Sequence, residues 1–298
     1  MSKFYPTSNT QIRDIAGIAA GATALINCPK GPRYRILLLS IGNTAAGNGN
    51  APTVASIVDE IKVTLGSKVV RRATGAQIDL INTANGAQYG SYGVGGGANG
   101  TGRTYLPIFF EEPWRKRPDV SDGLAVQTGW LDKNGVFQIS VKLQTGITPA
   151  LSCMAVTDAY YNGTGPNNIM KWNADDANTA AATLDLANIL QGAPAGDAVE
   201  SISLFDTSDA KTVIQARLMF GSVVIVDDMT YDQQTAKLKE YDMNPAAGAY
   251  HIVFDHDDQL QSLYPVSAIG SSQLTLTLSA ASAGTLRRIT QRLGDPTA

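Results

Sequence analysis

The sequence predicts an all-β fold made of two jelly-roll β-sandwich domains that lie side by side, each with a short inserted helix. The chain has 298 residues, which is enough for two domains that each bury a core. Only 16% of the residues are charged and 29 are glycines, a composition that favours strands and turns over helices. A degraded internal repeat further indicates that the two halves share one fold.

The repeat is clearest between residues 65–81 and residues 220–238. Both segments open with an apolar residue and a Gly-Ser pair, and both then reach a Thr that is followed three residues later by Gln. These pairs are Thr74 with Gln77 and Thr230 with Gln233. Thr-x-x-Gln is the pattern of a capping box, in which both side chains bond backbone N–H groups where a helix begins. Each copy therefore predicts a strand followed by a short helix, with chance similarity as the alternative.

The flanks of the repeat also correspond. Residues 33–39 match 199–205, residues 57–65 match 213–220, residues 107–111 match 251–255, and residues 136–141 match 273–278. Because predicted strands and the helix recur in the same order, we interpret the halves as two copies of one β domain with loop insertions. We assign residues 1–27 to an N-terminal arm, residues 28–147 to the first jelly roll and residues 148–298 to the second. A pair of immunoglobulin-like sandwiches is the competing fold, but the sequence lacks its Cys/Trp/Cys core.

The predicted N-terminal arm carries Ile12, Ile15 and Ile18, a spacing that gives a weak apolar stripe on a helix. The stripe is too short to fold alone, so we expect the arm to become ordered only against a neighbouring chain or a membrane. The arm has no clear signal-peptide cleavage site, and no later segment approaches about eighteen uninterrupted apolar residues. We therefore expect a soluble protein.

Several segments of the first half have strand character. Residues 33–42 contain five aliphatic residues, at positions 36–39 and 41, which predicts a strand buried on both faces. Further strands are predicted at residues 57–65, 105–110 and 124–128. Residues 136–143 give the clearest half-buried strand, because apolar and polar side chains alternate there. The inward set comprises Phe137, Ile139, Val141 and Leu143.

Residues 82–102 form a long glycine-rich segment, which we interpret as a flexible or surface-packed loop. Residues 93–98 within it match G-x-G-x-x-A, but a dinucleotide site requires a preceding buried strand and a following helix, and the flanks predict neither. In the second half, the sequence predicts strands at residues 151–161, 199–205, 213–220, 251–255 and 273–278, and a short helix at residues 180–190.

The residues with reactive side chains do not form a recognisable catalytic motif. Cys28 and Cys153 each lie beside apolar residues, which favours two buried free thiols over a disulfide or a metal site. The two histidines, His251 and His256, are too few for a zinc site. The densest acidic cluster contains Asp255, Asp257 and Asp258. It is a candidate for a hard cation such as a structural Ca²⁺, although an exposed polar turn is favoured and no other cofactor is expected.

The charges are divided unevenly along the chain. Residues 1–149 contain 15 Lys and Arg against 9 Asp and Glu, whereas residues 150–298 contain 8 against 17. The net charge of −3 argues against direct phosphate neutralisation, so no sequence-specific nucleic-acid binding is expected. The opposite net charges of the two halves would favour a contact between the first domain of one chain and the second domain of the next. Solubility alone is the alternative explanation.

Basic residues gather at two places, residues 115–117 and the segment with Arg287, Arg288 and Arg292. Either group could face anionic lipid headgroups, and a solvated loop or strand explains them nearly as well.

The sequence also resembles a known family. The resemblance covers most of the chain as spaced segments, among them residues 19–21 in the arm, residues 28–34 before the first long strand, and residues 61–67. In these segments the chain is similar to the major capsid protein of corticovirus-type phages, which are tailless icosahedral phages with an internal membrane. The glycine-rich segment 82–102 has no counterpart that we can place in that family.

The resemblance implies a structural protein with no catalysis. It implies two upright jelly rolls per chain, homotrimers that form pseudo-hexagonal capsomers, and a shell that covers a lipid vesicle. The expected partners are further copies of the chain, another capsid protein such as a vertex protein, and viral membrane lipids. The expected location is the virion capsid, assembled in the cytoplasm of a bacterial host.

A carbohydrate-binding or adhesive two-domain β protein, similar to a spike or lectin, is the alternative function. In that case exposed aromatic side chains would stack on sugars. The candidate aromatic residues are Tyr89, Tyr92, Trp114, Trp130 and Trp172. A cupin-type enzyme is a third possibility, but its metal site needs several histidines on neighbouring strands.

Overall fold

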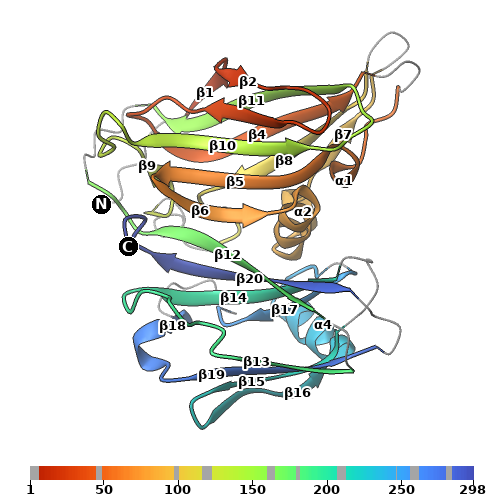
Figure 1. Ribbon diagram of the computed structural model, residues 1–298, viewed down its shortest axis with the longest axis vertical. Coiled ribbons are helices and arrows are strands. Elements are labelled where there is room, and N and C mark those ends of the chain that lie inside the picture. Colours follow the sequence, from red (N-terminus) through yellow and green to blue (C-terminus); the bar gives the residue numbers. More distant parts are fainter. Residues whose placement is uncertain are drawn as a thin grey trace.

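The structure is a computed structural model that describes residues 7–44, 49–96, 101–115, 123–159, 165–178, 182–206, 213–245, 247–255, 262–279 and 284–298. It contains two β-sandwiches, with the first half of the chain in the upper part of Figure 1 and the second half in the lower part. In the first half the strands are β1 (Thr7–Ile12), β2 (Ile15–Ala16), β3 (Thr23–Asn27), β4 (Arg33–Asn43), β5 (Val58–Gly66), β6 (Lys68–Ala73), β7 (Tyr92–Val94), β8 (Arg103–Phe109), β9 (Val126–Gln127), β10 (Val136–Leu143) and β11 (Pro149–Asp158). The helices of this half are α1 (Val54–Ile57), α2 (Gly75–Ala84) and a 3₁₀ turn, Ala87–Tyr89.

The second half has a similar order of strands, with one helix at the position that corresponds to α2. Its strands are β12 (Ile169–Asn178), β13 (Thr183–Ala187), β14 (Ala198–Asp206), β15 (Val213–Phe220), β16 (Val223–Thr230), β17 (Ala249–Val253), β18 (Tyr264–Pro265), β19 (Ser272–Leu278) and β20 (Thr285–Gly294). Helix α4 (Tyr231–Glu240) follows β16, and a 3₁₀ turn, Val266–Ala268, follows β18.

Strand order identifies both sandwiches as jelly rolls. In the first half, one sheet has the order β1-β11-β4-β8 and the other β3-β10-β5-β6. In the second half, the corresponding orders are β12-β20-β14-β17 and β13-β19-β15-β16. In each half these two sets of four strands have one connectivity, the double Greek key of a jelly roll, and β2, β7, β9 and β18 are additional strands. All four segment correspondences predicted from the sequence occupy equivalent strands, and the predicted double jelly roll is confirmed.

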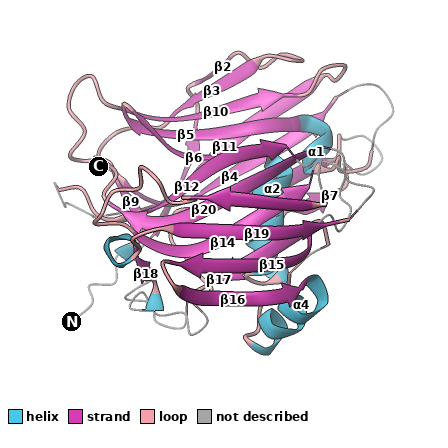
Figure 2. Cartoon of the chain, turned by 60° about the horizontal axis from the view of Figure 1, so that its bottom comes forward, coloured by secondary structure: helices cyan, strands magenta, loops and turns pink. Residues whose placement is uncertain are grey.

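Both predicted capping boxes are present. Thr74 Oγ1 accepts a hydrogen bond from Gln77 N at 3.1 Å, and Thr74 N donates to Gln77 Oε1 at 2.9 Å. Thr230 and Gln233 make the same pair of bonds at 3.3 and 2.9 Å. These bonds satisfy N–H groups that have no partner within a starting helix, so each helix begins directly after a strand. Figure 2 shows α2 and α4 as the longer helices beside the sheets.

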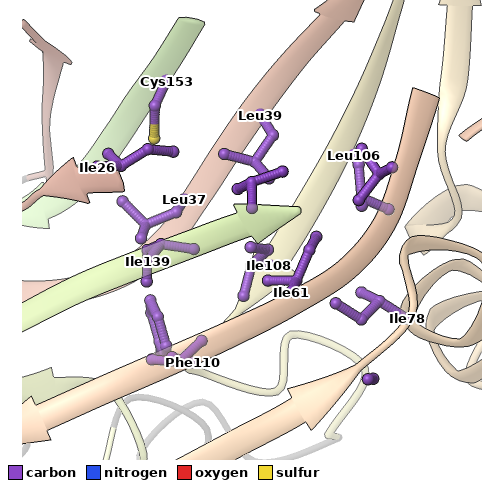
Figure 3. Close-up of a cluster of buried hydrophobic side chains, with 14 of the residues drawn as sticks. Ile26, Leu37, Leu39, Ile61, Ile78, Leu106, Ile108, Phe110, Ile139 and Cys153 are labelled. Atoms are coloured by element: carbon purple, nitrogen blue, oxygen red, sulfur yellow. The ribbon is translucent and has the colours of Figure 1, made fainter. Parts of the chain in front are cut away.

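The core of the first half lies between its two sheets. Phe137, Ile139, Val141 and Leu143 of β10 are buried, as the alternation predicts. They meet inward residues of β4, including Leu37 and Leu39, which are fully buried. Figure 3 shows this packing with Ile26, Ile61, Leu106, Ile108 and Phe110, and with Ile78 from α2. The second half has a separate cluster centred on residues such as Ile202, Leu218, Leu274 and Leu276.

The structure corrects the prediction for the N-terminal arm. Ile12 and Ile15 do not lie on a helix, because they belong to strands β1 and β2. Strand β1 pairs with β11 from Thr7 opposite Asp158 to Ile12 opposite Cys153. Strand β2 pairs with β3, and β3 pairs with β10. The arm is therefore ordered against its own chain, because Ile12 inserts into the first core and is 4% exposed.

Three further segments differ from the sequence expectations. Strand β11, placed by the sequence in the second domain, pairs with β1 and β4 in the first half. The described part of residues 180–190 forms strand β13 and a turn instead of a helix, because Leu184 and Leu186 alternate and pair with β19. Part of the glycine-rich segment is also ordered as strand β7, which adds an edge to β8.

Candidate functional site: the seam between the two halves

The two halves meet along a seam, which we define by β6 and α2 on the first half and by β12, β14, β17 and β20 on the second. Strand β6 runs parallel to β12, and Arg71 lies opposite Trp172. This pairing joins sheets of both halves into one sheet of ten strands, visible across the middle of Figure 1. The described contacts across the seam therefore fix the two jelly rolls to each other.

Arg71 is the central side chain of the seam. It is 5% exposed, and its guanidinium lies 5.1 Å from the ring centroids of Phe110 and Trp172. Arg71 Nε donates to Met170 O at 2.8 Å, and Nη1 donates to Phe109 O. Burial lowers the Arg71 pKa to about 10, although the nearby carboxylates Glu112 and Glu200 oppose this shift. The side chain therefore bonds backbone of both halves.

A second arginine, Arg115, organises a buried ion cluster. Its guanidinium donates through Nε to Glu112, through Nη1 to Asp255, and through Nη2 to Glu200 at 2.8 Å. Arg115 and Glu112 come from the first half, whereas Glu200 and Asp255 lie 85 and 140 residues further along the chain. Burial disfavours the charge of Arg115, but the three carboxylates raise its pKa. Burial raises the pKa of Glu200, and Glu112 adds to this effect while Arg115 opposes it.

The cluster borders a cavity of about 240 Å³ in the seam. Helix α2 and the residues that follow it form one wall, and the sheet of β14, β17 and β20 forms the other. The cavity is lined by Tyr89, Trp114, Glu200, Tyr241, His251 and Asp255, among others. His251 Nδ1 lies 2.8 Å from Ser203 Oγ, and burial lowers the His251 pKa to about 4.

We expect His251 to make the protein less stable in mild acid. Its pKa is depressed in the folded state, so its contribution is present above the unfolded value of 6.5 and is lost as the pH falls toward 4. Between pH 7 and 5 this contribution falls by about 2 kcal/mol. Urea unfolding of the wild type and His251→Asn at both pH values measures the difference, because asparagine keeps a polar group but does not titrate.

Neighbouring groups are present in both proteins of this comparison. The pKa of Glu200 is raised, so its contribution to stability grows as the pH falls from 7 toward its ordinary value of 4.5, opposite to that of His251. Asp255 and Asp242 also line the cavity. Their effects appear in both proteins and largely cancel in the difference. An unchanged pH dependence in His251→Asn contradicts the prediction.

The candidate cation site is placed only in part. Asp255 is buried and bonds Arg115, so Arg115 supplies the positive charge there. Asp257 and Asp258 lie outside the described residues. Within the described ranges, no group of three or more His, Cys, Asp or Glu side chains could hold a metal ion.

The predicted lipid-facing basic residues lie in different environments. Arg115 is buried in the seam, and residues 116 and 117 lie outside the described residues. The remaining arginines pair with carboxylates on β12 and directly before β14: Arg287 with Asp176, Arg288 with Asp175, and Arg292 with Asp197. These arginines are therefore partly neutralised by the protein itself.

The aromatic residues proposed for sugar stacking do not form one exposed platform. Trp172 is buried against Arg71, and Trp130 is half-buried with its indole N–H donating to Gln127 O. Tyr89 and Trp114 pack edge-to-face at 5.4 Å. Tyr92 is 51% exposed and stacks on Tyr105. The arrangement gives no support to the lectin-like alternative.

Two groups of buried side chains lie outside the seam. Cys28 and Cys153 are free and buried, as predicted, and burial raises the pKa of the Cys153 thiol to about 12. In a buried cluster that the sequence did not predict, Asp158 accepts hydrogen bonds from Arg33 at 3.1 Å and from Arg35 at 2.5 Å. Only the unusual presence of two arginines at the start of a buried strand pointed to it.

Among the described helices, none has the length and apolar character needed to span a bilayer.

Solved structures of viral capsid proteins share this fold. The major capsid protein P2 from Bacteriophage PM2 is 17% identical, with a TM-score of 0.76 over 97% of this chain and 98% of that chain. The PBCV-1 virus capsid is 12% identical, with a TM-score of 0.66 over 98% and 95% of the two chains. A structure of Sulfolobus Turreted Icosahedral Virus is 11% identical, with a TM-score of 0.64 over 96% and 90%.

A family model provides evidence beyond the fold. No curated protein sequence matches the chain. The model described as the viral coat protein P2 N-terminal domain matches residues 9–158, which is just over half of the chain and ends at the last residue of β11. The chain therefore belongs to the viral coat protein P2 family, a family of structural capsid proteins and not of enzymes.

Proposed function

We propose that this protein is a major capsid protein that trimerises into pseudo-hexagonal capsomers and tiles an icosahedral shell over an internal membrane. The observation that carries the proposal is the pair of jelly rolls with one connectivity, fixed side by side in one chain. Three such chains around a threefold axis present six similar sandwiches. A closed ring of this kind requires heterologous contacts between the first half of one chain and the second half of the next.

The uneven charge supports that order of contacts. Residues 1–149 contain six more basic than acidic residues, while residues 150–298 contain nine more acidic than basic residues. Opposite charges would favour contacts between unlike halves and disfavour contacts between like halves. Much of the charge within the seam is already paired inside one chain, as with Arg115, so the remaining surface charges would have to act.

We expect the purified protein to behave as a trimer, with a mass near three times 31.4 kDa, and to form extended arrays at high concentration. The mass is measured by light scattering behind gel filtration across a series of NaCl concentrations. If charge favours the contacts between subunits, the trimer dissociates at a higher protein concentration as salt rises from about 0.05 to 0.5 M. A monomer at every concentration contradicts the trimer, whereas a trimer that is indifferent to salt contradicts only the role of charge.

The remaining partners follow from symmetry and from the family resemblance. A pseudo-hexagonal tile does not fit the fivefold positions of a closed icosahedral shell, so a second capsid protein would occupy them. Contact with viral lipids and assembly in the bacterial cytoplasm rest on the resemblance to corticovirus-type capsid proteins. Flotation of purified trimers with anionic and with neutral vesicles tests the lipid contact.

A further inference from the structure

The seam cavity is bordered by more carboxyl groups than guanidinium groups. Three carboxylates, on Glu112, Glu200 and Asp255, surround the single guanidinium of Arg115. The side chains of Arg115, Glu112 and Asp255 are between 1% and 4% exposed, and that of Glu200 is 10% exposed. The next cation, Arg71, is directed to two backbone carbonyls. Burial and the neighbouring Glu112 make the ionised form of Glu200 costly, so another positive group at the cavity would stabilise that form.

Two polar atoms of the cavity lining have no hydrogen-bond partner among the described residues. They are Glu200 Oε2 and His251 Nε2. The two side chains come from the neighbouring strands β14 and β17, and His251 is 4% exposed. Buried polar atoms in native proteins nearly always have a partner, so their presence at one cavity indicates a missing donor. His251 is not part of the ion cluster, and it therefore provides independent evidence for a ligand.

The cavity also has the size for a small organic molecule, and part of its mainly polar lining is aromatic. Its volume of about 240 Å³ corresponds to about eight water molecules, which is below the range of drug-sized ligand sites. Tyr89 and Trp114 lie together on the wall from the first half, and Val253 lies on the opposite wall. Aromatic faces attract cations and also contact alkyl chains. A metal ion is disfavoured, because the described residues provide no set of three ligands for it.

We propose that the seam cavity binds a small primary alkylamine in its ammonium form. The ammonium group donates hydrogen bonds to Glu200 Oε2 and to His251 Nε2, and the alkyl chain lies against Tyr89 and Trp114. In this arrangement His251 is neutral, with Nδ1–H donating to Ser203 Oγ, which leaves the Nε2 lone pair free to accept. The ligand touches both jelly rolls, so binding stabilises their relative position. This property is separate from assembly into a shell.

Calorimetric titration of the purified full-length protein with n-butylammonium chloride tests the proposal. We expect saturable binding, together with a change in tryptophan fluorescence because Trp114 lines the cavity. Tetramethylammonium chloride has the same charge but no N–H donor, and butan-1-ol has the same chain but no charge. Both should bind at least tenfold more weakly. Absence of saturable binding, or equal affinity for n-butylammonium and tetramethylammonium, overturns the proposal.

Variants locate the site. Glu200→Gln is expected to weaken n-butylammonium binding at least tenfold, whereas Asp227→Asn, a carboxylate on β16 whose side chain is 77% exposed, should leave it unchanged. If Glu200→Gln does not fold, Tyr241→Ala replaces it, because Tyr241 lines the cavity and is 45% exposed. That variant should bind several-fold more weakly. Unchanged affinity in the folded variant contradicts the site.

Discussion

Replacing Arg115 with alanine is expected to lower the free energy of unfolding by about 3–5 kcal/mol at pH 7, because three buried carboxylates lose their shared cation. Burial and Glu112 already raise the Glu200 pKa, and Arg115 opposes this shift, so removal of Arg115 raises the Glu200 pKa further. The contribution of Glu200 to stability is fully present below its unfolded pKa and is lost as the pH rises through its folded pKa. The deficit of the variant should therefore shrink between pH 7 and pH 5. Urea unfolding at both pH values measures it.

Arg72→Ala is the matched control for this experiment. Arg72 lies next to Arg71 on β6, and its side chain is 44% exposed where it pairs with Glu60 at 2.7 Å. An exposed ion pair contributes about 1 kcal/mol or less, so this variant should unfold close to the wild type. Equal losses in Arg115→Ala and Arg72→Ala would show that the buried cluster does not stabilise the seam.

The second large effect is expected at Asp158. Its side chain is fully buried and bonds both Arg33 and Arg35 of β4. Asp158→Asn keeps the shape of the side chain but removes the charge, so two buried guanidinium groups lose their common anion. We expect a loss of about 3–5 kcal/mol in the free energy of unfolding, measured by urea denaturation at pH 7.

Asp176→Asn provides the comparison for Asp158. Asp176 also lies on a strand and pairs with an arginine, Arg287, at 2.6 Å, but its side chain is 43% exposed. Water solvates both charges there when the pair is broken, so the loss should stay below about 1 kcal/mol. The prediction for Asp158 is refuted if the two asparagine variants have the same urea midpoint.

Local patterns explain which parts of the fold could be predicted. The capping boxes at Thr74 and Thr230 depend on residues three apart, and the alternation of β10 depends on residues two apart. Strand β1 could not be predicted in this way, because its pairing partner β11 lies more than a hundred residues away in the sequence. In residues 180–190, several alanines suggested a helix and obscured the alternation of Leu184 and Leu186.

The contacts at the seam could not be predicted from the sequence. Arg115 belongs to a basic segment for which a lipid-facing or solvated position was expected, and nothing near Arg71 or Arg115 in the sequence indicates burial. Their burial follows from groups in the other half: Met170 O for Arg71, and Glu200 and Asp255 for Arg115. Long-range charge pairing leaves no periodic signal in a single sequence. The acidic cluster around Asp255 was noticed, but its partner was not.

The contacts across the seam have a consequence for the geometry of a shell. They include Lys68 Nζ to Thr297 O at 2.6 Å, Arg71 in the middle, and Asn244 N to Ala84 O at 2.7 Å. Because these contacts hold the jelly rolls at several positions, the chain cannot flex easily between its halves. If the chain tiles a shell as proposed, each subunit behaves as a stiff plate. Curvature must then arise at the joints between subunits, where the angle between neighbouring plates can change.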